Sequence, residues 1–287
     1  NISMTKWYTK YLEVFEKPID SVSEQTVNGV RKKLMALQSK EPVVSVVLIA
    51  HNEETHLLAC LWSLCDNTCP VPMEILTVNN NSTDKTTEVL DRLGATWFDE
   101  KLKGPGHARQ CGLNHAKGKY HICIDADTMY PPHYIETHLK ELMKPEVACT
   151  FALWSFVPRK GESVWTLRVY ESLRDLHLRI QAVKRPELCV RGMVFGFKTE
   201  YGRQIGFRTD IIRGEDGSLA LAMKPMGRLV FITSRKARAL TSNSTLNADG
   251  SLLKSFTKRL IKACRGLGGI FTKKEKYEDQ DSNIIKR

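Results

Sequence analysis

Short apolar runs alternate with helix-like periodicity through the middle of this chain. The run Val43–Ala50 is apolar and largely β-branched, which is typical of a strand buried on both faces of a sheet. Behind it, leucines recur at the spacing of one helix face, at positions 57, 58, 61 and 64. Further strands are expected at 74–78, 94–98 and 120–124, with helical segments between them. This order predicts an α/β fold with a mainly parallel, Rossmann-like sheet and helices on both faces.

The pattern changes after residue 128. A helix is expected behind Pro131-Pro132, a strand at 147–153, and a long amphipathic helix from Ser163 to about Val183. Two more strands are expected at 191–197, which holds two glycines, and at 229–232. His133 and His138 lack the i, i+4 spacing of a helical zinc pair, so we expect both on a helix surface.

Both ends of the chain predict helical extensions. Residues 1–40 carry apolar side chains at helical spacing in two segments that Pro18 separates. Near the other end, 251–274 predicts a basic amphipathic helix, which either lies on an anionic membrane surface or packs on its own domain. We therefore expect an N-terminal extension at 1–40, a domain at 41–235 that changes character after 128, and a basic tail at 236–287.

Composition narrows the class of protein. The net charge of +11 suits anionic partners, but no interleaved aromatic and basic motif indicates nucleic-acid binding. None of the eight cysteines forms a Cys-x-x-Cys pair, so we expect reduced thiols and no structural zinc. No apolar run approaches the length of a membrane span, and no signal-peptide pattern opens the sequence. We expect a cytoplasmic protein, with peripheral contact to the inner membrane face as an option.

Two acidic residues, Asp125 and Asp127, follow the apolar strand at 120–124 directly. Ligands in open α/β sheets bind outside the carboxyl ends of the strands. Two acids placed there repel each other unless a cation or hydrogen-bond donors compensate. Carboxylates of this kind suit Mg²⁺ or Mn²⁺, which often share the phosphates of a substrate. A solvated turn is the alternative that these residues alone leave open.

Polar residues also follow the other strands. The first strand ends in His51-Asn52-Glu53-Glu54 without glycines, which excludes a dinucleotide-binding turn, and both glutamates are expected in the first turn of the next helix. Asn79-Asn80 either binds a base or ribose or completes a turn. Gly104 opens a loop into a helix bearing Arg109, which is either an anion site or a plain turn. Glu215-Asp216 is either a helix start or the site of a general base.

These segments, taken together and in this order, resemble family 2 of the inverting nucleotide-sugar glycosyltransferases, which have the GT-A fold. The similarity covers residues 43–233 and rests on four segments: 44–54, 75–86, 104–127 and 192–216. It implies a nucleotide-binding half at 41–128 and an acceptor half at 129–235. The chain lacks the Gln-x-x-Arg-Trp motif and the membrane helices of the processive synthases, so the resemblance implies transfer of a single sugar.

The resemblance also implies a role for each candidate residue. Asp127 would hold Mn²⁺ or Mg²⁺, Asp125 would contact ribose or sugar, and Asp216 would be the general base on the acceptor hydroxyl. The nucleotide pocket would be lined by Ala50, Glu53, Asn80 and Arg109, and the acceptor side by Gly192 and Glu215. Many members carry an aspartate where this chain has Asn79-Asn80, so the resemblance does not fix the base, which is usually uracil.

The expected reaction moves one sugar from a nucleotide-sugar, such as a UDP-sugar, to a hydroxyl of a glycan or lipid-linked acceptor. Such chemistry belongs to the biosynthesis of cell-envelope polysaccharides. A protein of another class, which binds a surface or a nucleotide-sugar on the same core without turnover, is the alternative. A nucleotidyltransferase is the other enzyme class, but it would require a glycine-rich loop after the first strand.

Overall fold

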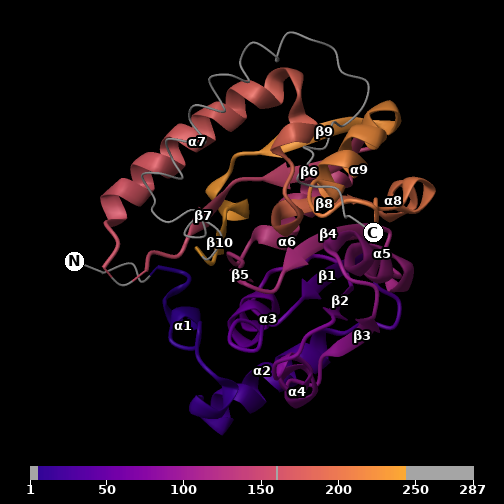
Figure 1. The fold of residues 1–287 in the computed structure, drawn as a ribbon. Coiled ribbons are helices and arrows are strands. Elements are labelled where there is room, and N and C mark those ends of the chain that lie inside the picture. The colour runs from indigo at the N-terminus through magenta and orange to yellow at the C-terminus, as the bar shows by residue number, and fades with distance from the viewer. Residues whose placement is uncertain (1–5, 160, 244–287) are drawn as a thin grey trace.

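The computed structural model describes residues 6–159 and 161–243, and a seven-stranded sheet forms its centre. The strands lie in the order β3-β2-β1-β4-β8-β6-β9 (Figure 1). Their bounds are β1 Val44–Ala50, β2 Met73–Asn80, β3 Thr96–Glu100, β4 Tyr120–Asp125, β6 Val147–Ala152, β8 Phe195–Lys198 and β9 Arg228–Ile232. Neighbours among β3, β2, β1 and β4 are parallel, as are β6 and β9, whereas β8 runs antiparallel to both β4 and β6. The expected mainly parallel sheet is therefore confirmed.

Helices cover both faces of this sheet, as the apolar pattern predicts. The longer helices and the short helical turns are α1 Thr9–Leu12, η1 Ile19–Ser21, α2 Glu24–Leu37, α3 Leu57–Cys65, α4 Thr86–Arg92, α5 Pro105–His115, α6 Tyr134–Leu142, α7 Val164–Lys184, η2 Pro186–Cys189, η3 Gly192–Val194, α8 Thr199–Ile205, α9 Glu215–Met223, η4 Lys224–Met226 and η5 Arg235–Ala237. Successive side chains of a strand point to opposite faces. Val46 and Leu48 of β1 accordingly join the main core, while Val47 packs with Leu76 and Ala116 on the other side.

The register of the parallel strands brings their polar ends together. Ala50 of β1 pairs with Asn79 of β2, and Ile49 of β1 pairs with Asp125 of β4. The carboxyl ends of three strands therefore lie at one edge of the sheet. Asn79 and Asn80 are the last residues of β2 and not part of a turn, because their backbones still pair with β3.

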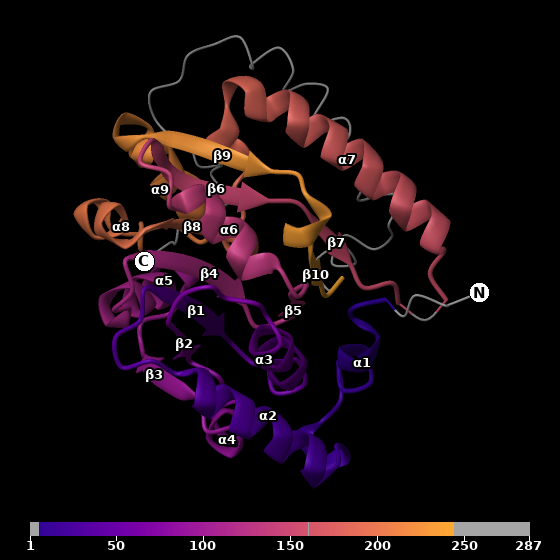
Figure 2. The same ribbon diagram turned by 180° about the vertical axis from the view of Figure 1, so that it is seen from behind.

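A second, three-stranded sheet has the order β5-β10-β7 and lies beside β4 (Figures 1 and 2). Its strands are β5 Thr128–Met129, β7 Trp154–Phe156 and β10 Ala239–Thr241. Leu240 of β10 pairs with Met129 and with Ser155, which are remote in sequence. Residues 236–243, expected to begin the basic tail, thus continue the folded domain. The helix expected at 251–274 lies outside the described residues.

The N-terminal segment, which includes α1 and α2, packs on the outside of α3. Tyr11, Phe15 and Ile19 are buried around the short α1 and η1, and Val30 and Leu34 are buried along α2. Only four residues form α1, so the first of the two expected helices is shorter than the apolar spacing suggests. The seven described cysteines are free thiols, as expected. Within the described ranges, no helix has both the length and the apolar character of a membrane span.

Three local expectations are wrong. The segment expected as one strand at 191–197 begins with the 3-10 turn η3, and only its second part forms β8. Helix α3 begins at Leu57, so Glu53 and Glu54 precede its first turn. His138 is completely buried, because α6 lies on β6. Its Nδ1 lies 2.8 Å from Thr150 Oγ1, within hydrogen-bond distance. Burial lowers the pKa of His138 to about 3, so this histidine is a neutral core residue.

Candidate active site

A cleft of about 600 Å³ lies at the carboxyl edge of the sheet. Its walls come from the ends of β1 and β2, the start of α5 and the acidic segment, residues 125–127, at the end of β4. Five of the residues singled out in the sequence line it: Ala50, Glu53, Asn80, Asp125 and Asp127. A second cavity, of about 470 Å³, lies before β4 beside Lys117 and Arg203 and contains none of those residues. The larger cleft is therefore the candidate site.

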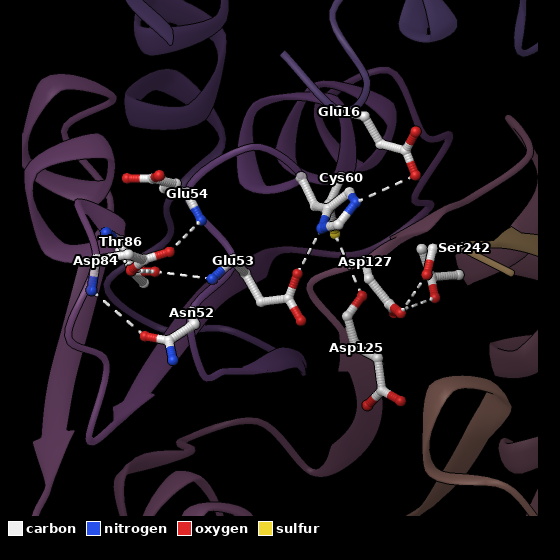
Figure 3. Close-up of polar contacts among 12 residues, drawn as sticks. Glu16, Asn52, Glu53, Glu54, Cys60, Asp84, Thr86, Asp125, Asp127 and Ser242 are labelled. Atoms are coloured by element: carbon white, nitrogen blue, oxygen red, sulfur yellow. Dashed lines mark hydrogen bonds and ion pairs between the residues drawn. The ribbon is translucent and has the colours of Figure 1, made fainter. Parts of the chain in front are cut away.

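The turn after β1 is held by hydrogen bonds from the segment after β2. Asn52 adopts a positive φ of 56°, and its side-chain oxygen accepts a hydrogen bond from the Thr83 backbone N–H at 2.7 Å. The Glu53 backbone N–H donates to Thr86 Oγ1 at 2.9 Å (Figure 3). Asparagine tolerates this left-handed conformation better than most residues. The two strand ends thus form one rigid wall of the cleft.

Asn80 is buried and fastens the neighbouring loop. Its amide nitrogen donates to the Glu100 carbonyl at 2.9 Å and to the Leu102 carbonyl at 2.8 Å. Its side-chain oxygen accepts from the Gly104 N–H at 3.1 Å. Both amide donors are therefore used within the protein, and the residue shapes the pocket wall at the start of α5. Asn79 similarly donates to Asp99 Oδ1 at 2.8 Å, which leaves its own buried Oδ1 without a hydrogen bond among the described residues.

Glu53 faces the acidic segment and is paired with a histidine that the sequence did not single out. His56 Nδ1 lies 2.6 Å from Glu53 Oε2, and His56 Nε2 lies 3.8 Å from Glu16 Oε1. Burial opposes a charge on this ring, but the hydrogen bond to Glu53 and the nearby charges of Glu53, Asp127 and Glu16 raise the pKa of His56 above its usual value. Figure 3 shows that Glu53, Asp125 and Asp127 converge on one region.

Asp127 is held by the last described residues of the chain. Ser242 Oγ donates to Asp127 Oδ2 at 3.0 Å (Figure 3), and Thr128 Oγ1 donates to Asp127 Oδ1 at 3.1 Å. The Ser242 backbone N–H also donates to the Asp127 carbonyl at 3.0 Å. Burial, followed by the charges of Asp125 and Glu53, raises the pKa of Asp127 to about 6. Its carboxylate therefore sits in excess negative potential, which a cation would relieve.

The acidic side chains of the cleft suit a cation that takes few of its ligands from the protein. Over residues 6–159 and 161–243, no group of three His, Cys, Asp or Glu side chains is arranged to hold a metal. A fully protein-made cage of the zinc or calcium type is thus not formed by these residues. A single carboxylate beside an open cleft matches Mg²⁺ or Mn²⁺ that shares substrate phosphates and water. Asp127 meets that description.

Arg109 connects the acidic segment to α9. The guanidinium is only 3% exposed, and its Nη1 donates to the Ile124 carbonyl at 3.2 Å while Nη2 donates to Asp125 Oδ1 at 2.5 Å. Its Nε lies 3.4 Å from Asp216 Oδ1. Gly192 lies against this pair, because a Cβ at that position would overlap both the Arg109 guanidinium and the Asp216 carboxylate. The absence of a side chain at Gly192 therefore permits the buried ion pair to form.

The two acids of α9 are buried at its first turn. Burial raises the pKa of Asp216, against the charge of Arg109, which lowers it. Burial and the neighbouring Asp216 raise the pKa of Glu215 to about 8, so Glu215 is mainly protonated at neutral pH. Asp216 Oδ1 is a buried atom, and it accepts no hydrogen bond from the described residues. A carboxylate with a raised pKa and an unused acceptor is suited to take a proton.

The structure thus sorts the predicted residues into two connected groups. Ala50, Glu53, Asn80, Asp125 and Asp127 line the cleft, whereas Arg109, Gly192, Glu215 and Asp216 form a buried cluster behind it. Asp125 belongs to both groups, since Arg109 binds it directly. Sequence reasoning missed His56 and Ser242. A histidine three residues after Glu53 is a weak helical-spacing signal for the first, but nothing in the sequence marks a serine 115 residues after Asp127.

Comparison with known proteins concerns the family and the fold of this chain. The family model described as glycosyl transferase family 2 matches residues 45–201, which is more than half of the chain. An uncharacterised glycosyltransferase of Haemophilus influenzae is 25% identical over 129 residues, covering 43% of this chain and 51% of that protein. The chain therefore spans about half the length of this curated relative.

Two solved structures share the fold. A mannosyltransferase from Pyrobaculum calidifontis, in complex with GDP-Man and Mn²⁺, superposes with a TM-score of 0.56 at 19% identity, covering 83% of this chain and 72% of that one. S. aureus TarS, in complex with UDP-GlcNAc, superposes with a TM-score of 0.54 at 17% identity, covering 70% of this chain and 58% of that one. These likenesses establish the fold. The chain belongs to glycosyl transferase family 2 and has the GT-A fold.

Proposed function

We propose that this protein transfers a single sugar from a nucleotide-sugar, such as a UDP-sugar, to a hydroxyl of a glycan or lipid-linked acceptor, with inversion at the anomeric carbon. The observation that carries the proposal is the link made by Arg109, which joins the acidic wall of the cleft to the buried Asp216. One cation thereby fixes the relative positions of a donor-side carboxylate and an acceptor-side carboxylate. Residues 41–128 would supply the donor half and 129–235 most of the acceptor half.

The donor side would accommodate the nucleotide and its diphosphate. The cleft of about 600 Å³ is in the size range of small-molecule sites. Asp127 would hold Mn²⁺ or Mg²⁺, and a bound divalent cation neutralises the charge that grows on a departing diphosphate. Asp125, oriented by Arg109, would contact ribose or sugar. Ala50, Glu53 and the loop fastened by Asn80 would enclose the base and ribose. That the related mannosyltransferase was solved with GDP-Man and Mn²⁺ supports this arrangement.

On the acceptor side, Asp216 would remove the proton of the attacking hydroxyl. Its raised pKa makes it a stronger base than an exposed aspartate, while the Arg109 charge limits that rise and so favours the ionised form. Glu215, mainly protonated, adds no second negative charge beside it. Attack from the face opposite the leaving group would invert the sugar in one displacement, without a covalent enzyme intermediate. We place the reaction in the cytoplasm, in cell-envelope polysaccharide biosynthesis.

Asp216→Asn tests the proposed base. The amide keeps the size of the side chain but cannot accept a proton, so transfer should fall by roughly 10²–10⁴-fold, the range typical of general bases. Donor binding in the presence of Mn²⁺, measured by calorimetry across a panel of nucleotide-sugars, should change little. Asp210→Asn is the matched control, because Asp210 is an exposed residue paired with Arg208 on the preceding loop. Transfer by Asp216→Asn at the wild-type rate would exclude Asp216 as the base.

The same panel distinguishes a non-catalytic binding protein. Asn79 motivates this second candidate, because its amide is bound to Asp99 at the position where related enzymes often carry an aspartate for the base. Heat of binding for a nucleotide-sugar with neither transfer nor metal-dependent hydrolysis would favour a binding protein. Turnover of any donor would exclude it.

A further inference from the structure

The outer face of α7 is apolar along its whole length. Figures 1 and 2 show this helix at the periphery of the molecule, at the opposite end from α2 and α4. Its large apolar side chains recur three or four residues apart and are exposed by the following fractions: Trp165 74%, Val169 38%, Leu173 43%, Leu176 56%, Ile180 50% and Val183 82%. Successive spacings of three and four keep them on one side of a helix. Exposed apolar stripes of this extent mark interaction surfaces.

The inner face of α7 accounts for its attachment to the domain without this stripe. Leu167 and Leu178 are buried, and the Arg174 guanidinium lies 4.3 Å from the centre of the Trp154 ring. Asp175 pairs with Arg174 at 2.8 Å and with Arg238 at 2.7 Å. Ser163 caps the helix by accepting from the Thr166 N–H. The outer apolar residues therefore have a function other than holding the helix in place.

The charges exposed on α7 have one sign. Its only acidic residues, Glu171 and Asp175, are both buried, and α7 is described over its full length, so no acidic side chain of this helix is exposed. Arg168 and Arg179 are exposed and flank the apolar stripe at positions one residue from Val169 and Ile180. An apolar stripe bordered by arginines is the pattern of helices that lie in the interface of a membrane with anionic lipids.

We propose that the outer face of α7 docks flat on the surface of an anionic phospholipid bilayer. The helix has 21 residues, which at 1.5 Å per residue gives about 30 Å of contact in the membrane plane. The apolar stripe inserts at the level of the acyl-chain boundary, and Arg168 and Arg179 bind lipid phosphates. This inference is independent of the proposed glycosyl transfer, since it rests on a surface remote from the cleft.

Charge argues against two protein surfaces that could cover the apolar stripe of α7, a second copy of this chain and its own segment 251–274. If a second copy of the chain packed its α7 against this α7, Arg168 and Arg179 of one copy would approach Arg168 and Arg179 of the other. The segment 251–274 of this chain carries lysines and arginines and no acidic residue, so its apolar side would also bring like charges to α7. Like charges brought together at an interface oppose association. An anionic lipid surface is the occupant whose charge is complementary.

Vesicle co-sedimentation of the full chain tests the proposal. Vesicles of phosphatidylcholine alone should bind the protein weakly. Vesicles in which about one-third of the lipid is anionic phosphatidylglycerol should bind it strongly at low salt. The emission of Trp165 should shift to shorter wavelength on binding. Trp165→Phe should keep binding and lose this shift, which identifies the inserted residue among the five tryptophans.

Two α7 variants have matched controls elsewhere on the surface. Leu173→Gln with Leu176→Gln should lower partitioning by about tenfold or more, because two half-exposed leucines no longer enter the lipid. Met35→Gln with Met143→Gln removes a similar exposed apolar area, 54% and 42%, from α2 and from the residue that follows α6, and should leave binding unchanged. Arg168→Gln with Arg179→Gln should lower binding to anionic vesicles by roughly 30-fold. Lys32→Gln with Lys40→Gln, both exposed, is the charge control.

Three results would overturn the proposal. Unchanged vesicle binding by the Leu173/Leu176 variant, with loss of binding on Leu253→Gln and Phe256→Gln, would move the membrane contact to the tail. Absence of vesicle binding, with a dimer of the wild type that the α7 variant converts to monomer, would identify a second copy as the occupant. Absence of vesicle binding, with a monomer whose melting temperature falls equally for the tail and α7 variants, would identify the tail as the cover of α7.

Discussion

Removal of the Arg109 charge is the sharpest test of how this site is held together. Arg109→Gln would keep a polar side chain of similar reach but leave Asp216, which is only 8% exposed, without a cation beside it. It would also remove the 2.5 Å hydrogen bond to Asp125. Removing one partner of a buried ion pair typically costs 3–5 kcal/mol, since the remaining charge is uncompensated, and we expect a loss of about this size.

The expected loss depends on pH. The Arg109 charge is what keeps the pKa of Asp216 from rising further under the effect of burial. In the variant, Asp216 takes up a proton at a higher pH, which removes the uncompensated charge. The variant should therefore lose more stability at pH 8 than at pH 5. A double variant with Asp216→Asn should lose less than the sum of the two single losses, because the charge that Arg109 neutralises is gone.

Urea unfolding followed by circular dichroism measures both effects. With an m-value of about 2–3 kcal/mol/M, a loss of 3–5 kcal/mol lowers the midpoint by roughly 1–2 M. Arg92→Gln is the matched control, since Arg92 pairs with Asp20 and Glu24 at the surface, where such pairs contribute about 0–1 kcal/mol. Equal losses for the two arginine variants, or a loss by Arg109→Gln that does not change with pH, would refute the reasoning.

Three further changes address other parts of the site. Gly192→Ala should cost about 1–3 kcal/mol in thermal unfolding and abolish transfer, because the added carbon displaces Arg109, whereas Gly29→Ala in the open middle of α2 should stabilise by up to about 1 kcal/mol. Because the pKa of Glu215 is raised in the folded state, the folded protein holds this proton more tightly than the unfolded chain does. The resulting stability is complete below about pH 4.5 and is lost as the pH rises through about 8. Glu215→Gln should thus gain stability over the wild type between pH 5 and pH 9, up to about 5 kcal/mol, and a pH-independent difference would contradict the assignment. Asn80→Ala should release the loop before α5 and weaken nucleotide-sugar binding in calorimetry, while unchanged affinity would show that this loop is not part of the pocket.

The fold was predictable where one short-range rule decides the structure. The run at Val43–Ala50 and the acidic residues after the strand at 120–124 gave β1, β4 and the carboxyl edge correctly, because burial on both faces leaves a plain apolar signature. The long helix from Ser163 was also predicted closely, since its cap and its apolar period are both local. Element ends were less accurate. Glu53 and Glu54 have favourable helix-start chemistry, but their backbone N–H groups donate to Thr86 and Asp84 at the start of α4, which holds them outside α3.

The missed features all depend on contacts between remote segments. His138 lies on a helix whose other polar residues face solvent, and only the packing of α6 on β6 reveals that it is buried. Gly192 in the 3-10 turn η3 lies against Arg109 and Asp216, which sit on two other elements, and no local rule predicts that contact. The sequence indicated Arg109 and Asp216 separately, as a nucleotide-pocket residue and a base. Their 3.4 Å separation is tertiary information that no spacing in the chain contains.

The second sheet has a consequence for the order in which this protein matures on the ribosome. β1 to β4 are complete when residue 125 has been synthesised, so the cleft walls can assemble early. The bonds from Thr241 and Ser242 to Asp127 require a further stretch of more than a hundred residues. A nascent chain therefore holds its acidic segment without these donors until translation is nearly at residue 243. A ligand that depends on the Asp127 carboxylate would then be bound only late, after residues 129–235 have emerged.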